Sequence, residues 1–241
     1  METRSAENRY QWYAASAGTY FYHCHRNTTL HFEMGMYGML IIDPPQGRGF
    51  VRRENDVIPY DHERMWVADE MDAMWHLKDK SAGLNSTILI GPEQVPFSDE
   101  DEGLNDFRPE YFFLTGVTND QTETDERIVV NAKVGETILL RILCAGYNYH
   151  TWTLGIDAEC IAMDGRTLGR TDAPGAHCAY SYPFVIPAYT PFDLTTARRY
   201  DLLVRPTEPG DYPAVVEIHH INASRYPDAL GVCRTVIHVT E

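Results

Sequence analysis

The 241-residue sequence has no long apolar run and no excess of basic residues. A membrane-spanning helix needs about 20 consecutive apolar residues, and no segment approaches that length. The start of the chain, METRSAENRYQW, lacks the apolar stretch of a signal peptide, so it gives no leader from which to read the compartment. The formal net charge is −15, which argues against nucleic acid and anionic membrane surfaces as partners. We therefore expect small molecules or metal cations as partners, no nucleic acid and no membrane span.

Long amphipathic helical patterns are also missing. Aromatic and β-branched runs alternate instead with glycine and proline, at spacings typical of short strands joined by turns. This pattern predicts an all-β fold built as a Greek-key β-sandwich. The strand-like runs cover residues 9–16, 18–25, 38–43, 63–70, 127–132, 136–143, 150–155, 199–206, 210–220 and 234–239.

A change of composition marks a domain boundary. In IIDPPQGRGFVRRENDVIP, proline, glycine and charge replace apolar residues, and we place the boundary between residues 50 and 56. Residues 1–50 contain three strand-like runs, fewer than a sandwich needs. We expect this part to be the C-terminal portion of one domain, and residues 56–241 to form a second, complete domain.

One short segment, GTYFYHCHRNTTLHFEMGMYGML (18–40), combines soft sulfur with imidazole. Cys24 is followed after six residues by His31 and, four residues further, by Met36. Blue-copper centres use two imidazoles, a thiolate and a weak axial thioether, and a hairpin of this kind could direct three such ligands at one ion. The alternative is that cysteine and methionine are apolar core residues and the histidines lie on the surface. The ordered set within one hairpin favours copper.

These residues resemble the type 1 copper loop of cupredoxins, and more closely that of multicopper oxidases and copper nitrite reductases. The resemblance implies that Cys24, His31 and Met36 are type 1 copper ligands. His23 and His25 match the positions through which multicopper oxidases pass electrons to type 3 coppers, whereas nitrite reductases use only the preceding histidine, on a type 2 copper. Neighbouring strand residues face opposite sides, so both should project away from the Cys24 side. The spacing from Cys24 to His31 is nearer to that of nitrite reductases.

The rest of the chain resembles a further cupredoxin domain of the same family. His219 and His220 are adjacent, so on a strand they face opposite sides and cannot act as a His-x-His pair. One of them could still bind a single copper at a domain interface. We expect His150 and His177 to be packed or solvated imidazoles. The motifs of this resemblance are ERMWVADEMDAMWH, YFFLTGVTND, VGETILLRILCAGYNYHTWTLG, IAMDGR, TTARRYDLLVRPTEPGDY and GVCRTVIHV.

One expected ligand is missing, because the family supplies a type 1 imidazole upstream of the cysteine and no histidine precedes His23. We therefore expect the first domain to be truncated, and the 241-residue chain to bind copper weakly and show little blue absorption. A further domain that contributes to the copper cluster could also be lost after Glu241.

The function implied by the resemblance is a copper-dependent oxidoreductase. Electrons would pass from a small-molecule or metal-ion reductant through a type 1 copper to a type 2 or type 3 centre that reduces oxygen. The alternatives are a copper nitrite reductase-like enzyme, which would reduce nitrite, and a non-catalytic electron-transfer module. The family also implies a periplasmic or secreted location, and we expect that the chain could form a homo-oligomer.

Smaller motifs carry weaker expectations. Four cysteines could form two disulfides in an oxidising compartment, although spacing does not give the pairing. Three short segments match glycosylation acceptors, and the acidic segment 98–106 is expected to be a solvated loop. The cysteines are Cys144, Cys160, Cys178 and Cys233, and the acceptor motifs are NTT (27–29), NST (85–87) and NAS (222–224).

Overall fold

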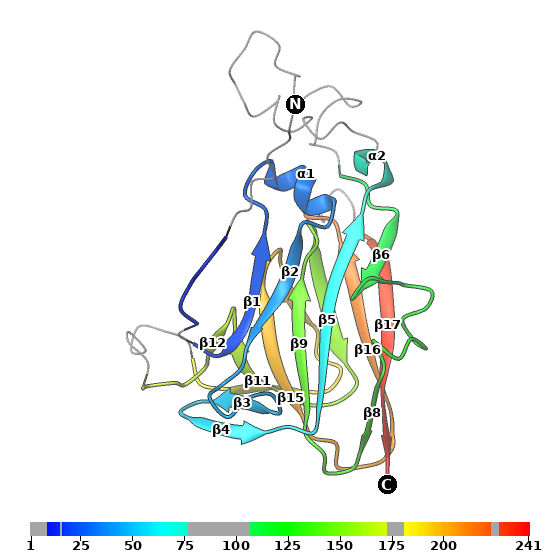
Figure 1. Cartoon of the computed structure of the whole chain (residues 1–241). Helices are drawn as coiled ribbons and strands as arrows, with labels where there is room; N and C mark the ends of the chain where they lie inside the picture. Colours follow the sequence, from blue (N-terminus) through cyan, green and yellow to red (C-terminus); the bar gives the residue numbers. More distant parts are fainter. Residues whose placement is uncertain (1–8, 15, 77–106, 173–180, 223–226) are drawn as a thin grey trace.

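The protein is described by a computed structural model that covers residues 9–14, 16–76, 107–172, 181–222 and 227–241. These residues are mostly strands, so the predicted all-β class is confirmed (Figure 1). Two sheets face each other as a sandwich, and a separate hairpin lies against one of them. None of the described helices has the length and apolar content that crossing a bilayer requires.

One layer of the sandwich is a five-stranded sheet. Its central strands are antiparallel, and the edge strand β8 runs parallel to β17. The order in space is β14 (Phe192–Leu194), β10 (Tyr149–Leu154), β16 (Gly210–His219), β17 (Ala229–Thr240) and β8 (Val130–Lys133).

The second layer is an eight-stranded sheet in which β5 and β9 pair in parallel although about 70 residues separate them along the chain, which requires a long crossover. The order is β12 (Arg166–Thr167), β11 (Ala158–Met163), β15 (Arg199–Val204), β9 (Ile138–Cys144), β5 (His62–Met71), β6 (Tyr111–Leu114) and β7 (Val117–Thr118), and β13 (Phe184–Ile186) pairs with β11.

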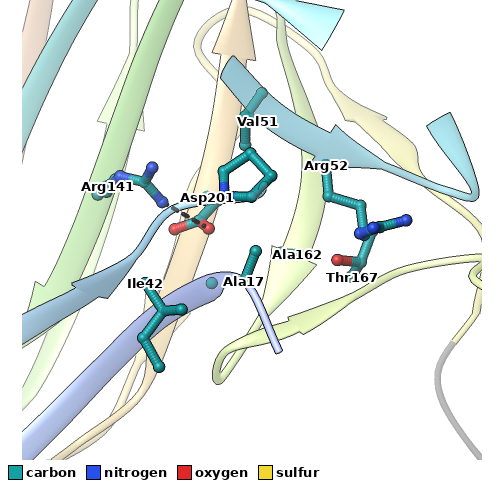
Figure 2. Close-up of a pocket in the computed structure, with 10 residues that line it drawn as sticks. Ala17, Ile42, Val51, Arg52, Arg141, Ala162, Thr167 and Asp201 are labelled. Carbon is teal, nitrogen blue, oxygen red and sulfur yellow. Dashed lines mark hydrogen bonds and ion pairs between the residues drawn. The ribbon is translucent and has the colours of Figure 1, made fainter. Parts of the chain in front are cut away.

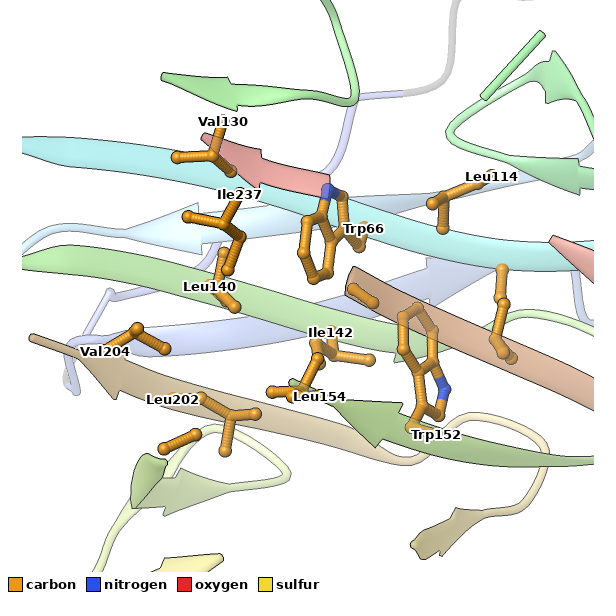
Figure 3. Close-up of a cluster of buried hydrophobic side chains, with 14 of the residues drawn as sticks. Trp66, Leu114, Val130, Leu140, Ile142, Trp152, Leu154, Leu202, Val204 and Ile237 are labelled. Atoms are coloured by element: carbon orange, nitrogen blue, oxygen red, sulfur yellow. The ribbon is translucent and has the colours of Figure 1, made fainter. Parts of the chain in front are cut away.

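The core lies between these two sheets. Trp66 from β5 and Trp152 from β10 face each other with ring centroids 6.1 Å apart and planes within 8° of parallel (Figure 3). The indole nitrogen of Trp66 donates a hydrogen bond to the carbonyl of Ile128 at 2.9 Å, which satisfies its one buried donor. Aliphatic side chains from both sheets surround the two rings. The two sheets of the sandwich therefore enclose one continuous core.

The segment 18–42 forms an antiparallel hairpin of β1 (Gly18–His23) and β2 (Tyr37–Ile42), connected through the short helix α1 (Thr28–Glu33). The hairpin lies across the outer face of the eight-stranded sheet, and α1 lies at its upper end (Figure 1). This contact explains why β9 is buried along its whole length, since the core covers one face and the hairpin side covers the other.

A buried ionic network joins the hairpin to the sheet. The Arg141 guanidinium donates to the Thr19 hydroxyl at 2.8 Å and to the Asp201 carboxylate at 3.2 Å, and Thr19 donates to the same carboxylate at 2.5 Å. Arg141 also donates to Glu63 at 2.7 Å. Figure 2 shows Arg141 and Asp201 beside a cavity of about 10 Å³, which is room for one water. The polar groups of this interface are thus paired rather than left buried without partners.

Two details differ from the sequence predictions. Residues 9–14 of the predicted strand 9–16 have no strand structure. At the predicted domain boundary, β3 (Phe50–Arg53) and β4 (Asp56–Pro59) form a small hairpin of their own. The other nine predicted strands correspond to observed ones. The short helix α2 (Ala73–His76) follows β5.

Candidate metal centre

Cys24 and His31 face each other in the turn between β1 and β2. Cys24 follows the last residue of β1, and its amide donates to the carbonyl of Met36 at 3.0 Å, which extends the hairpin ladder by one step. The Cys24 sulfur lies 3.3 Å from Nδ1 of His31. The amide of Arg26 donates to the same sulfur at 3.3 Å. A thiol and an imidazole seven residues apart therefore occupy one small volume.

The helix α1 brings His31 to this position. It begins after Asn27, which adopts a left-handed conformation (φ 48°), and it buries Leu30 and Phe32. It ends at Glu33, and Gly35 follows the C-cap Met34 with a φ of +80°, a conformation that favours glycine just after a helix C-terminus. The chain then returns so closely that the amide of Met36 donates to the carbonyl of His31 at 2.9 Å. The short helix followed by glycine thus brings the backbone segments of all three predicted ligands into contact.

The thioether of Met36 is the least fixed of the three groups. Its side chain is 53% exposed, and that of Met34 is 39% exposed, while Met39 is half-buried against the sheet. Among the described residues, no group of three or more histidine, cysteine, aspartate or glutamate side chains is arranged to hold a metal ion. The structure therefore fixes a thiol and one imidazole, and the Met36 thioether stays a predicted ligand.

His23 and His25 lie together. Their rings stack with centroids 4.5 Å apart, and Nδ1 of His23 lies 2.9 Å from the carbonyl oxygen of Cys24. His23 is half-buried and packs near Phe21 and Phe32, whereas His25 is exposed. Neither ring belongs to the sandwich core, and the two rings share one side of the chain, as the alternation of strand side chains predicts.

An aromatic cluster connects α1 to the sandwich. Phe32 contacts Tyr37 and Tyr147, with ring centroids 4.8 Å and 5.4 Å away. The Tyr147 hydroxyl donates a hydrogen bond to the carbonyl of Thr29, in the first turn of α1. Tyr147 lies in the turn between β9 and β10. This turn therefore fixes the helix that carries His31.

The buried side chain of Glu33 holds the other end of α1. The Glu33 side chain is 1% exposed, and Oε1 accepts a hydrogen bond from the amide of Asp72 at 2.8 Å. Nε2 of His76, in α2, lies 3.4 Å from the same oxygen. Burial raises the pKa of Glu33 to about 8 despite the amide bond, and nearby Asp69 adds to the shift. At neutral pH this carboxyl is therefore mostly protonated.

Tyr37 and Asp69 form a second contact between the hairpin and β5. The Tyr37 hydroxyl donates to Oδ2 of Asp69. Burial raises the pKa of Asp69 to about 7, against the effect of this hydrogen bond, and also raises the pKa of Tyr37. The contact therefore contains a carboxyl that titrates near neutral pH.

His150 is packed, as expected from the sequence. It is fully buried, and Nε2 lies 2.7 Å from Oε2 of Glu70. Oε1 of Glu70 accepts the amide of Asn148 at 2.8 Å, next to Tyr147. Burial opposes a charged imidazole, but the neighbouring Cys144 sulfur and the Glu70 carboxylate raise the pKa of His150 well above its usual value. This buried pair fixes the turn that contacts α1.

The remaining predicted histidines lie elsewhere. His219 ends β16 and stacks on Tyr149 with ring centroids 5.2 Å apart. His220 Nδ1 accepts a hydrogen bond from the amide of Asn222 at 2.9 Å. Both thus belong to the end of the five-stranded sheet, and the hairpin that carries Cys24 lies on the other sheet. His177 is outside the described residues.

The prediction of two disulfides is wrong for the described cysteines. Cys24, Cys144, Cys160 and Cys233 are all free. The last three are buried core residues, and burial raises the pKa of the Cys160 and Cys233 thiols to about 12. They act as small apolar side chains. Cys178, residues 85–87 of one glycosylation motif and the acidic segment 98–106 lie outside the described residues.

Sequence reasoning missed the groups that support α1, namely Glu33, Asp69 and Tyr147. Each is a polar residue within an otherwise apolar pattern, and a buried polar residue normally has a partner. That signal could have marked them as contact residues. Their partners lie 32 to more than 100 residues away in the chain, so spacing alone could not have named them.

Comparison with known proteins gives one sequence match and many matches of fold. The family model described as multicopper oxidase matches residues 3–47. A search of curated proteins finds no match.

Three of the solved structures with a similar fold show its range. Fet3p, a multicopper oxidase that functions in iron import, has a TM-score of 0.58 at 17% identity, covering 93% of this chain and 34% of its own. Blue copper oxidase from Nitrosomonas europaea has a TM-score of 0.54 at 18% identity, with 92% and 56% covered. Copper nitrite reductase from Nitrosomonas europaea has a TM-score of 0.50 at 16% identity, with 94% and 63% covered.

The present chain thus spans between 34% and 63% of the length of these relatives. At these identities the likeness concerns the fold, and it confirms the predicted cupredoxin-like sandwich. The resemblance drawn from the sequence is therefore confirmed: the chain is similar to the multicopper oxidases, in sequence over the segment that carries Cys24 and in fold over most of its length.

Proposed function

We propose that the chain is part of a copper-dependent oxidoreductase of the multicopper oxidase family. In this proposal Cys24, His31 and Met36 bind a type 1 copper, which accepts electrons from a small-molecule or metal-ion reductant and passes them to a second copper centre that reduces oxygen. His23 and His25 would bind at that centre, of type 3 or type 2. The observation that carries the proposal is the 3.3 Å approach of the Cys24 sulfur to His31, within the segment that matches the family model.

The donor chemistry of the pair suits copper. Soft thiolate and borderline imidazole are the donors that copper uses in both of its oxidation states. Metal bonds of about 2.0–2.3 Å, separated by the angles of a trigonal or tetrahedral site, place sulfur and nitrogen roughly 3.6–3.8 Å apart. The observed 3.3 Å would have to open by only a few tenths of an ångström. These residues therefore fit the metal that the family implies.

The surrounding residues would keep the ligands oriented. The Arg26 amide points at the Cys24 sulfur, and hydrogen bonds to a liganding sulfur tune its donor strength. The Tyr147 and Glu33 contacts fix both ends of α1 and so restrict the His31 ring. The contact of His23 Nδ1 with the Cys24 carbonyl adds a second connection, besides the peptide bond, between the thiol residue and an imidazole on the other side of the chain.

The first alternative is a nitrite reductase-like enzyme. The long spacing from Cys24 to His31 supports it, and there His23 alone would serve a type 2 copper. The second alternative is a non-catalytic electron-transfer module. The stacked pair of His23 and His25 speaks against it, because an electron carrier does not need two imidazoles beside its cysteine.

Several further assignments belong to the same proposal. Residues 1–50 are the C-terminal part of one cupredoxin domain, and residues 56–241 form a second one. His219 or His220 contributes a single copper ligand at a domain interface. The protein is periplasmic or secreted, as expected from the family resemblance, and it forms a homo-oligomer.

The test determines which electron acceptor, oxygen or nitrite, the protein reduces. The complete protein of which this chain is proposed to be part is loaded with copper and supplied with a one-electron reductant, and oxygen consumption is measured. The assay is then repeated with nitrite in the absence of oxygen, and nitric oxide is measured. We expect oxygen consumption that Cys24→Ser abolishes and that His25→Ala reduces strongly. The control, Met65→Leu, replaces an exposed methionine of β5 and should leave oxygen consumption unchanged. Consumption of nitrite alone supports the first alternative. Copper that cycles without consuming either acceptor supports the second.

A further inference from the structure

A pocket of about 380 Å³ opens on the five-stranded sheet of the second domain. Its walls come from the turn before β10, from β14 with the turn after it, and from Ile221, which follows β16. This volume lies within the range of small-molecule sites. The proposed copper function assigns no ligand to the residues that line it.

The alternation of β10 shows which side chains face the pocket. His150 and Trp152 are buried toward the core, so Tyr149 and Thr151 project to the outer face. The Tyr149 ring is stacked on His219 from the neighbouring strand, with the planes within 15° of parallel. This contact orients the Tyr149 ring, which lines the pocket.

The pocket carries negative charge. Asp193 lies opposite Thr151, whose hydroxyl donates to Oδ1 at 2.6 Å. The Asp193 side chain is exposed and forms no ion pair with the residues that the structure describes, so its second oxygen can accept from a ligand. A net charge of −15 adds to the attraction for cations.

The rest of the lining is apolar or aromatic. Ile221 is 75% exposed, and its amide is bonded to Oδ1 of buried Asn148 at 3.1 Å, which fixes the backbone there. Tyr147 forms a further wall, and the hydroxyl of Thr196 is already bonded to the carbonyl of Gly146 at 2.7 Å. A single free carboxylate beside tyrosine rings is a poor site for a metal ion, which prefers several oxygen ligands. It suits a cation that is itself partly apolar.

We propose that this pocket binds an organic cation, an ammonium group attached to an aromatic or aliphatic body. The ammonium group lies beside Asp193 and over the ring of Tyr149, and the apolar body contacts Ile221. Tyrosine faces attract ammonium groups, including quaternary ones that donate no hydrogen bond. Tyr147 also bonds to α1 and Tyr149 stacks on His219, but the site uses neither the Cys24 sulfur nor the His31 ring, so the inference goes beyond the proposed function and does not depend on it.

The experiment titrates the copper-free protein with benzyltrimethylammonium, by calorimetry and by chemical-shift mapping. We expect saturable binding with shifts at Tyr149, Asp193 and Ile221. Asp193→Asn keeps the bond from Thr151 and removes the charge, and it weakens binding about fivefold, as expected for an exposed ion pair. Tyr149→Leu weakens binding by a similar factor. The control, Asp120→Asn, changes another exposed carboxylate and leaves binding unchanged.

Neutral benzyl alcohol separates charge recognition from simple apolar binding. We expect it to bind at least fivefold more weakly than the cation. Equal binding of the alcohol, or unchanged affinity in Asp193→Asn, would overturn the proposal. So would the absence of saturation at millimolar cation. Because Asp193 is exposed, its variant keeps the test decisive even if Tyr149→Leu does not fold.

Discussion

The ring contacts of Phe32 give the sharpest mechanical prediction. Phe32 is 4% exposed and has ring contacts with Phe21, His23, Tyr37 and Tyr147 at centroid distances of 4.8–6.0 Å. Truncating a buried phenylalanine to alanine costs about 3–5 kcal/mol. Because the lost contacts join α1 to the two hairpin strands and to Tyr147 of the sandwich, we expect Phe32→Ala to loosen the hairpin around the proposed ligands.

Hydrogen exchange measures this loosening locally. The amides of Cys24 and Met36 are bonded within the turn and report its opening. A loss of about 3 kcal/mol corresponds to roughly 100-fold faster exchange at these amides, provided that they exchange by local opening. Phe32→Leu should recover much of the protection, because it restores most of the buried volume.

The control is Phe192→Ala, which removes a half-buried ring that stacks on Tyr200 away from the hairpin. We expect it to lower the stability of the sandwich and to leave hydrogen exchange at the Cys24 and Met36 amides nearly unchanged. If Phe32→Ala also left these amides protected, α1 would be held by other contacts, and the reasoning would be refuted.

Three further predictions concern the buried polar groups. Burial raises the pKa of Asp69 from an ordinary value near 4 to about 7, so the folded state holds an extra proton between these pH values. The contribution of Asp69 to stability is therefore greatest below about pH 4 and falls as the pH rises to 7. Asp69→Asn should remove this part of the pH dependence of the unfolding free energy measured in urea. Arg141→Ala leaves the Asp201 carboxylate buried without its cation, and we expect it to lower the free energy of unfolding by about 3–5 kcal/mol. Adding Asp201→Asn should restore part of this loss in thermal unfolding. A loss below about 1 kcal/mol would contradict the stabilising role of the network. Gly146→Ala places a methyl group 1.8 Å from the Glu70 carboxylate, so we expect it to displace that side chain and to lower the melting temperature by several degrees. An unchanged melting temperature would show that the turn rearranges at little energetic cost.

Strand positions were largely readable from the sequence. The runs that form β9, β10, β15, β16 and β17 have the β-branched and aromatic composition of strands and end at turn residues, and the structure has strands there. Residues 9–14 have similar composition but no strand structure, because a strand also needs a partner to complete its hydrogen bonds.

The candidate site was only partly readable. The order of Cys24, His31 and Met36 indicated a hairpin that brings them together, since the turn is local in sequence. The residues that fix α1 come from distant strands, and their pairing depends on how the hairpin lies on the sheet. The predicted disulfides failed for a related reason: composition does not distinguish a buried thiol from a paired one, and the three described core cysteines are buried and free.

The central claim, that Cys24 and His31 bind copper together, is tested most directly by X-ray absorption of the protein loaded with Cu(I). The reduced ion suits this test because soft sulfur donors favour it and because it does not depend on blue colour, which we expect to be weak with one imidazole in the hairpin. The account predicts one bound copper with a short copper–sulfur distance of about 2.2 Å, which Cys24→Ser removes and His31→Ala perturbs. Copper bound without a short sulfur distance, or with one that remains in Cys24→Ser, would contradict it.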